Sequence, residues 1–245
     1  MVVVYLGSMG WSYKFWPIYK GLESKDYLTY YSKLFNSVEV NSTFYRIPRK
    51  ASVKAWSEQT PECFRFSVKI PQSISHSPSL RYDPEKLDAF LEHIEPLRAK
   101  LGPLLLQLPP YLKTENSNQL SILLTQLEGY EKAVEFRHRD WFREDIYDIL
   151  REHKAALVYV EYPWQPLEKV ETGGFAYIRL EGERKKINGE KGVIEIERER
   201  DNKHWAEKIN QLSEEGKTVY MYVSKFYSGY PPVDIKQIAT RLENL

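Results

Sequence analysis

The chain has 245 residues, of which 42% are hydrophobic and 28% are charged, so it can bury the core of one globular domain or at most two small ones. Its 35 Lys and Arg residues balance 34 Asp and Glu residues to a formal net charge of +1, which excludes a strongly basic nucleic-acid coat but leaves a local cationic patch open. The single cysteine, Cys63, excludes a disulfide framework within the chain, and no apolar run approaches the roughly 18 to 20 residues of a membrane span, so we expect a cytoplasmic protein.

Strand and helix patterns alternate along the chain. The expected strands are Val2–Leu6, Ser37–Asn41, Phe64–Lys69, Leu104–Gln107, Lys132–Arg137, Ala156–Glu161, Phe175–Glu181 and Val219–Ser224. The expected helices are Ser24–Phe35, Ala51–Gln59, a helix that starts at Asp83-Pro84, Leu120–Leu127, Glu144–His153, Lys203–Leu212 and Ile235–Leu242.

Eight strands in alternation with helices predict an α/β fold, a closed (β/α)8 TIM-like barrel that forms a single domain over residues 1–245. The sixth connection, Tyr162–Gly174, holds two prolines and two glycines and is expected to be irregular. The alternative is an open doubly wound sheet, but the first turn, Gly7–Gly10, does not match the dinucleotide-binding fingerprint.

An ordered set of motifs covers about the first 60% of the chain. The motifs are Gly7-Ser-Met-Gly-Trp11-Ser-Tyr13, Phe35 to Pro48, Phe64 to Pro71, Ile74-Ser-His76, Leu101 to Pro110, Val134 to His138, and Trp141-Phe142. This set resembles the family called domain of unknown function 72. The resemblance implies a TIM-like barrel and no particular activity, because the family has no established reaction. Two segments depart from the family pattern: Glu181 stands where histidine is usual, and Ser224-Lys225 stands where asparagines are usual.

The strands alternate between apolar and polar residues, which is unusual for parallel strands that are covered on both faces. Because side chains alternate with a period of two, the apolar set of each strand shares one face and the polar set shares the other. We expect the apolar set to meet the helices and the polar set to point inward. Isolated charges are unstable in such an interior, so they must be paired.

Three acids, Glu39, Glu135 and Glu161, face four bases on the polar set. The bases are Arg65, Lys69, Arg137 and Arg179. One interpretation is a structural ion-pair network, and the other is a site whose surplus positive charge receives a substrate anion. Sites in TIM barrels lie at the carboxyl ends of the strands. Residues late in their strands are therefore substrate-binding candidates, namely Asn41, Lys69, Gln107, Arg137, Glu161 and Arg179.

Acidic and histidine residues are the candidates for proton transfer. Glu39 and Glu135 can form an acid–base pair if their surroundings separate their pKa values, although salt bridges to Arg or Lys are the favoured interpretation. His138 follows the fifth strand and is a third catalytic candidate, and His76 follows the third strand as a binding candidate. No histidine pair has metal-ligand spacing, so we predict neither a metal nor another cofactor.

Aromatic residues also follow strand ends, with arginines beside them. Trp11, Tyr45 and Trp141, together with Arg46 and Arg137, suit stacking on a base or a sugar and binding of a phosphate. The alternative for each ring is a place in the core. The leading hypothesis is an enzyme, such as a hydrolase or isomerase, that binds a small anionic or sugar-like substrate. A nucleic-acid-binding or phosphodiester-processing barrel and a non-catalytic scaffold are the alternatives, with no membrane partner and the oligomeric state left open.

Overall fold

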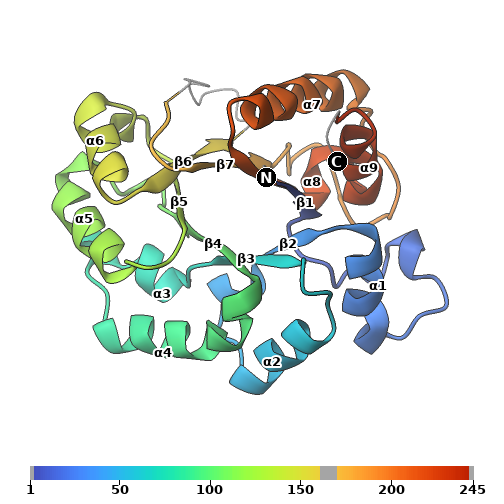
Figure 1. Ribbon diagram of the computed structural model, residues 1–245, viewed down its shortest axis with the longest axis horizontal. Coiled ribbons are helices and arrows are strands. Elements are labelled where there is room, and N and C mark those ends of the chain that lie inside the picture. The colour runs from blue at the N-terminus through green and yellow to red at the C-terminus, as the bar shows by residue number, and fades with distance from the viewer. Residues whose placement is uncertain (1–2, 161–169, 243–245) are drawn as a thin grey trace. The chain divides into compact units, whose positions relative to one another are not determined.

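The computed structural model describes residues 3–160 and 170–242, along which strands and helices alternate (Figure 1). The strands are β1 (Val4–Ser8), β2 (Ser37–Val40), β3 (Arg65–Lys69), β4 (Leu101–Gln107), β5 (Lys132–Glu135), β6 (Ala155–Val160), β7 (Phe175–Leu180) and β8 (Thr218–Val223). The α-helices are α1 (Tyr27–Leu34), α2 (Lys50–Glu58), α3 (Gln72–Ser75), α4 (Pro84–Ile94), α5 (Ser117–Gln126), α6 (Glu144–Glu152), α7 (Glu199–Glu214), α8 (Lys225–Ser228) and α9 (Pro231–Ala239). The 3-10 turns are η1 (Pro17–Tyr19), η2 (Ser24–Asp26), η3 (Ser42–Phe44), η4 (Pro78–Leu80), η5 (Glu95–Lys100), η6 (Thr114–Asn116) and η7 (Arg139–Trp141).

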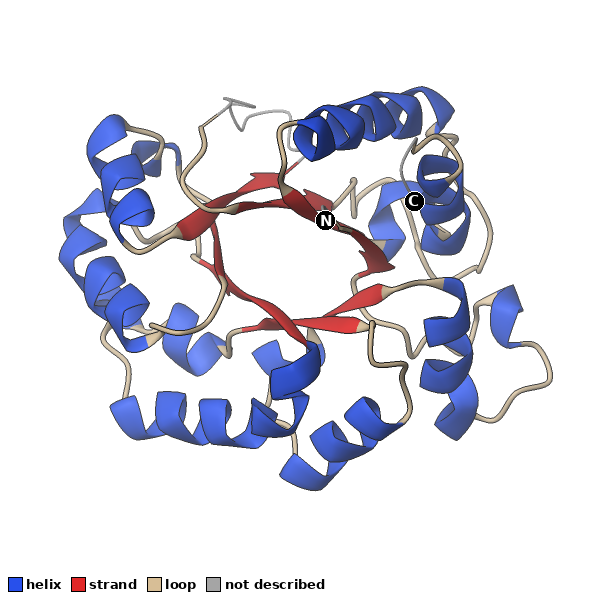
Figure 2. Cartoon of the chain, viewed as in Figure 1, coloured by secondary structure: helices blue, strands red, loops and turns tan. Residues whose placement is uncertain are grey.

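The described strands form an eight-stranded sheet in the order β1-β8-β7-β6-β5-β4-β3-β2. The pairs β1–β8, β7–β8, β3–β4, β4–β5 and β5–β6 are parallel, and a parallel bridge joins Met9, just after β1, to Glu39 on β2. Figure 2 shows the strands in red and the intervening helices in blue. The prediction of an α/β fold of the (β/α)8 TIM-like barrel type is confirmed.

The chain divides into two compact units. The first unit comprises Met1–Glu39, Tyr159–Trp164 and Phe175–Leu245, and it holds β1, β7 and β8 with α1, α7, α8 and α9. The second comprises Val40–Val158 and Gln165–Gly174, and it holds β3, β4 and β5 with α2 to α6. The sequence-based expectation of a single domain over residues 1–245 stays a prediction.

The start of α4 follows the capping chemistry of the sequence, whereas the start of α9 differs from the prediction. Asp83 accepts a hydrogen bond from the Glu85 amide at 3.1 Å and Pro84 opens α4, as predicted. The last helix begins at Pro231 and not at Ile235, so that predicted boundary was wrong. Proline is tolerated in a first turn because its missing N–H has no partner there. The sixth connection, which the sequence predicts to be irregular, lies mostly outside the described residues.

The approach of β1 to β2 explains a glycine in the first motif. A Cβ at Gly7 would lie 2.0 Å from the carbonyl oxygen of Ser37, so only glycine fits. Beside it, the Asn36 amide completes the edge of β1, because it donates to the Val4 carbonyl and accepts from the Leu6 amide, both at 2.8 Å.

Apolar and polar residues alternate along the strands of the first unit, and the apolar residues form its core. The apolar residues of β7 and β8, such as Ile178 and Met221, pack with Trp205 and Ile209 of α7 and with Ile235 of α9. The alternate residues of the same strands are therefore left to face the opposite side, as the sequence predicts.

Candidate functional site

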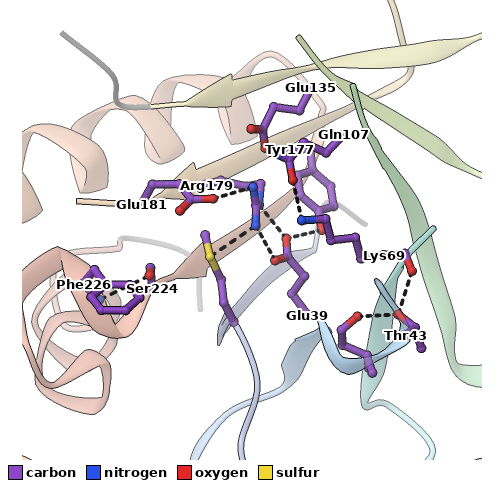
Figure 3. Close-up of polar contacts among 12 residues, drawn as sticks. Glu39, Thr43, Lys69, Gln107, Glu135, Tyr177, Arg179, Glu181, Ser224 and Phe226 are labelled. Carbon is purple, nitrogen blue, oxygen red and sulfur yellow. Dashed lines mark hydrogen bonds and ion pairs between the residues drawn. The ribbon is translucent and has the colours of Figure 1, made fainter. Parts of the chain in front are cut away.

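A buried ion network surrounds Arg179 on β7 in the first unit. Its Nε and Nη2 atoms donate to the Glu39 carboxylate, both at 2.9 Å, and its Nη1 atom lies 2.6 Å from Glu181 (Figure 3). The Tyr177 hydroxyl donates to Glu39 at 2.8 Å. None of these four residues is more than 2% exposed. The guanidinium group of Arg179 is thus shared by two carboxylates.

This pairing favours the structural interpretation for Arg179 and Glu39. A guanidinium whose N–H groups already meet two carboxylates has little capacity left for a substrate anion. Burial, and then the negative charge of Glu39, raise the pKa of Tyr177 well above its usual value, so its hydroxyl keeps the proton that it donates. The network therefore fixes the positions of β2 and β7 side chains within the first unit.

A second charged cluster lies in the second unit, at the carboxyl ends of β3, β4 and β5. Gln107 and Glu135 are in register on neighbouring strands, and Lys69 ends β3. The Lys69 ammonium donates to the Gln107 side chain, and Arg137 donates to Glu135 (Figure 3 draws the first bond). The Lys69 ammonium also lies 4.3 Å from the centre of the Phe44 ring. Among the residues that the structure describes, this cluster holds two cations and one carboxylate.

His76 lies beside this cluster, and the charges of the cluster affect its pKa. Its ring meets the Phe44 ring edge to face at 4.9 Å, and its Nδ1 atom lies 3.0 Å from the Ser75 hydroxyl. Burial, and then the positive charges of Lys69 and Arg137, lower the pKa of His76 to about 4. The imidazole is therefore neutral at pH 7 and stands in a positive potential.

Two of the candidate residues take structural positions. Trp141 is fully buried, lies parallel to Phe136 at 4.9 Å and donates through its ring nitrogen to the Leu112 carbonyl at 2.8 Å. His138 accepts the Asp140 amide at 3.2 Å and thereby caps η7. For Trp141 the geometry favours the place in the core that the sequence left open as an alternative, and His138 stabilises the turn after β5.

The other candidates lie on loops at strand ends. Asn41 is half-buried directly before η3, and Trp11 is half-buried after β1. Tyr45 is 74% exposed. Arg46 is exposed and makes no ion pair with any residue of 3–160 or 170–242. Glu161 lies outside the described residues.

Sequence reasoning missed several members of these clusters. Glu181 was considered only as a departure from a family motif, yet it lies two residues after Arg179 and pairs with it. Tyr111 is 57% exposed and donates its hydroxyl to the His76 carbonyl at 2.6 Å. Its position a few residues after β4 was the available signal, as was the place of Phe44 after β2.

The second departure from the family motif has a local explanation. Ser224 accepts the Phe226 amide at 3.2 Å and caps α8. Lys225 pairs with Glu190 at 2.6 Å and lies 5.0 Å from the centre of the Phe226 ring. Both residues therefore serve the loop that follows β8.

The described residues contain no group of three His, Cys, Asp or Glu side chains placed to hold a metal ion. Within the same ranges, no helix combines the length and the apolar composition that crossing a membrane requires. A cavity of about 570 Å³ lies between α1 and α9, and it is lined mostly by apolar residues and by none of the candidates. The charged clusters are thus separate from this cavity.

Relatives of known sequence match the chain over part of their length. The chain is 36% identical to the UPF0759 protein YecE of Escherichia coli (strain K12) over 141 residues, which are 57% of this chain and 50% of YecE. It is 31% identical to the UPF0759 protein YunF of Bacillus subtilis (strain 168) over 156 residues, 60% of this chain and 55% of YunF. The chain thus spans about half the length of these curated relatives.

Solved structures match over nearly the whole chain. A DUF72 family protein from Thermotoga maritima MSB8 has a TM-score of 0.82 and 31% identity, with 99% of this chain and 100% of that chain covered. A DUF72 family protein from Enterococcus faecalis V583 has a TM-score of 0.82 at 22% identity, over 99% of this chain and 96% of that chain, which shows the fold alone. The family model described as "Protein of unknown function DUF72" matches residues 5–245, and the chain therefore belongs to the DUF72 family.

Proposed function

We propose that the protein is an enzyme that binds a small anionic substrate at the carboxyl ends of β3, β4 and β5. The terminal residues of these strands are Lys69, Gln107 and Glu135, and each carries a polar group. In (β/α)8 enzymes the chemistry takes place at this end of the strands. The position of the cluster therefore supports a substrate site.

The two cations beside His76 are the observation that carries the proposal. The Lys69 ammonium lies 4.3 Å from the centre of the Phe44 ring that His76 contacts, and burial, and then the positive charges of Lys69 and Arg137, lower the pKa of His76 to about 4. The two cations thus give the site a locally positive potential. Such a potential disfavours a cation and stabilises an anion. The Lys69 ammonium and the Arg137 guanidinium are the groups that would meet a phosphate or a carboxylate of the substrate.

We assign proton transfer in this site to His76 and Glu135. The imidazole is unprotonated at pH 7, and a bound anion would raise its pKa from about 4 towards the range in which it accepts a proton effectively. A carboxylate beside an arginine is suited to orient or stabilise the charge that develops. His138 is a weaker candidate because one of its ring nitrogens already accepts the Asp140 amide. Fold similarity alone names no reaction, so the proposal ends at binding and proton transfer.

Calorimetric titration with inorganic phosphate tests the site. We expect binding by the natural protein and a loss of about 10- to 100-fold in affinity for Lys69→Met, because hydrogen bonds to charged groups contribute about 1.5–3 kcal/mol. Lys86→Met, at an exposed lysine on α4, is the matched control and should bind phosphate normally. Arg137→Met is less suitable because it leaves the buried Glu135 without its guanidinium.

NMR titration of His76 gives a second readout. A bound anion offsets the positive potential of Lys69 and Arg137, so the pKa of His76 should rise from about 4 towards its ordinary value. We expect a Kd for phosphate of about 1 mM, so about 10 mM phosphate should nearly saturate the site. If phosphate at this concentration neither binds nor changes the pKa of His76, the proposal is wrong.

A further inference from the structure

We propose that the anion is carried by a molecule with a flat aromatic ring, such as a nucleobase, and that Tyr45 and Tyr111 hold this ring by stacking. The inference rests on the proposed anion site and names the class of its substrate. Tyr45 and Tyr111 belong to the same unit as Lys69 and Arg137.

Both tyrosines expose large rings at the ends of strands. Tyr45 follows η3 after β2 and is 74% exposed, and Tyr111 follows β4 and is 57% exposed. Loops at the carboxyl ends of barrel strands are where substrate-binding side chains are found. Tyrosine is well suited to such contacts because it offers a large, rigid surface at a low cost in conformational entropy.

A continuous row of rings joins the two tyrosines. Tyr45 meets Phe44 at 5.2 Å between ring centres, Phe44 meets His76 at 4.9 Å, and His76 meets Tyr111 at 6.5 Å, each edge to face. The Tyr111 hydroxyl donates to the His76 carbonyl at 2.6 Å, which holds this exposed ring in place. A ring that is fixed before binding loses less entropy when a ligand stacks on it.

The row of rings also contacts the cations. The Lys69 ammonium lies 4.3 Å from the centre of Phe44, which is the second ring of the row. Lys69 and Arg137 both act on His76, the third ring. A ligand whose anionic group meets Lys69 and Arg137 therefore has its remaining part next to aromatic rings. The exposed Arg46, which directly follows Tyr45, adds a planar cation to the same region.

The balanced charge of the whole chain favours a small molecule over a polynucleotide. A polynucleotide gains most of its affinity from many phosphate contacts, which require a basic surface. The formal net charge here is +1, with 35 bases against 34 acids. A molecule with one anionic group and one ring matches the cluster of Lys69 and Arg137 better.

Three probes separate the anion from the ring: inorganic phosphate, ribose 5-phosphate and AMP. We expect AMP to bind about tenfold or more tightly than ribose 5-phosphate, because stacking of a base on an aromatic side chain contributes about that factor. Tyr45→Leu should lower the affinity for AMP towards the affinity for ribose 5-phosphate. Tyr45→Phe is the matched control, since it keeps the ring, and should retain the preference for AMP. Tyr111→Leu should act as Tyr45→Leu does.

The outcomes distinguish this inference from the proposed function. If all three probes bind equally and Lys69→Met weakens all of them, the anion site stands and the ring inference is wrong. If phosphate fails to bind the natural protein, the proposed function itself fails. If a ten-residue oligothymidylate binds far more tightly than AMP, with a steep dependence on salt, the partner is a nucleic acid and the small-molecule inference is overturned.

Discussion

The two charged clusters of this molecule come from the same kind of strand pattern, but their chemistry differs. Around Arg179 in the first unit, two buried carboxylates share one guanidinium, and a tyrosine donates to one of them. Around Lys69 in the second unit, two cations accompany one carboxylate and act on a neutral histidine. In the first arrangement the charged groups pair with one another, and Arg184 adds a second cation 3.8 Å from Glu181, whereas the second arrangement holds positive potential that a ligand can use.

This difference teaches where to look for function in a polar barrel interior. A buried ion pair that is completely hydrogen-bonded is costly to disturb and contributes mainly to positioning. A cluster whose charges impose an unfavourable potential on a neighbouring group is kept at a cost to stability, as is common in binding and catalytic sites. Variants in the first cluster should therefore change mainly the stability of the protein, and variants in the second cluster should change mainly ligand binding.

The largest effect is expected for Arg179→Met. The substitution leaves the buried carboxylates of Glu39 and Glu181 without their common guanidinium, and such a loss costs about 3–5 kcal/mol in the free energy of unfolding. Urea denaturation measures the change. The matched variant in the other cluster, Lys69→Met, keeps the packing of the aliphatic stem but loses the hydrogen bond of the ammonium to Gln107, so we expect a smaller loss of about 1–2 kcal/mol. Equal losses in the two variants would contradict the comparison.

Trp141→Phe should have a smaller effect on stability. The variant loses the hydrogen bond to the Leu112 carbonyl and leaves a void beside Phe136, which together cost about 1–3 kcal/mol. Its counterpart, Tyr45→Phe, changes an exposed ring and should alter the free energy of unfolding by no more than about 0.5 kcal/mol. Both are measured by urea denaturation. A stable Trp141→Phe variant that binds phosphate poorly would place this ring in the site and not in the core.

How far the sequence predicts these clusters depends on which physical rule sets each contact. Lys69, Gln107 and Glu135 come together because parallel strands bring their carboxyl ends to one edge, and strand ends can be identified from alternation. The same rule identifies Arg179 and Glu181 as neighbours on one face. It does not indicate that Arg179 also meets Glu39, because the two residues lie 140 positions apart in the chain.

The burial of residues in the loops after the strands could not be predicted from the sequence. Trp141 and Tyr45 both follow strand ends next to arginine-containing segments, yet one is fully buried and the other is 74% exposed. The direction in which a loop turns depends on tertiary contacts, such as the capping of η7 by His138 and the hydrogen bond of Trp141 to Leu112. Residue type and position relative to a strand carry no information on that direction.

The last prediction concerns acid stability at His76, beside the second cluster. The pKa of His76 is about 4 in the folded chain, whereas its ordinary value is 6.5. Between pH 6.5 and pH 4 the unfolded chain therefore binds a proton at His76 that the folded chain does not bind. Stability should therefore fall as the pH decreases from about 6.5 to about 4, and His76→Gln should reduce this fall. Thermal denaturation across this range measures it.

Comparison of the two proteins at each pH is essential, because Asp234 acts in the opposite direction. Burial raises the pKa of Asp234 from 3.8 to about 6, so the folded chain holds a proton that the unfolded chain has released, and stability from this group grows as the pH falls through the same range. Only the difference between the natural protein and His76→Gln isolates the imidazole. Phosphate should reduce this difference in stability between the two proteins, because a bound anion raises the affinity of His76 for its proton. A stability difference that phosphate leaves unchanged would argue against an anion beside Lys69 and Arg137.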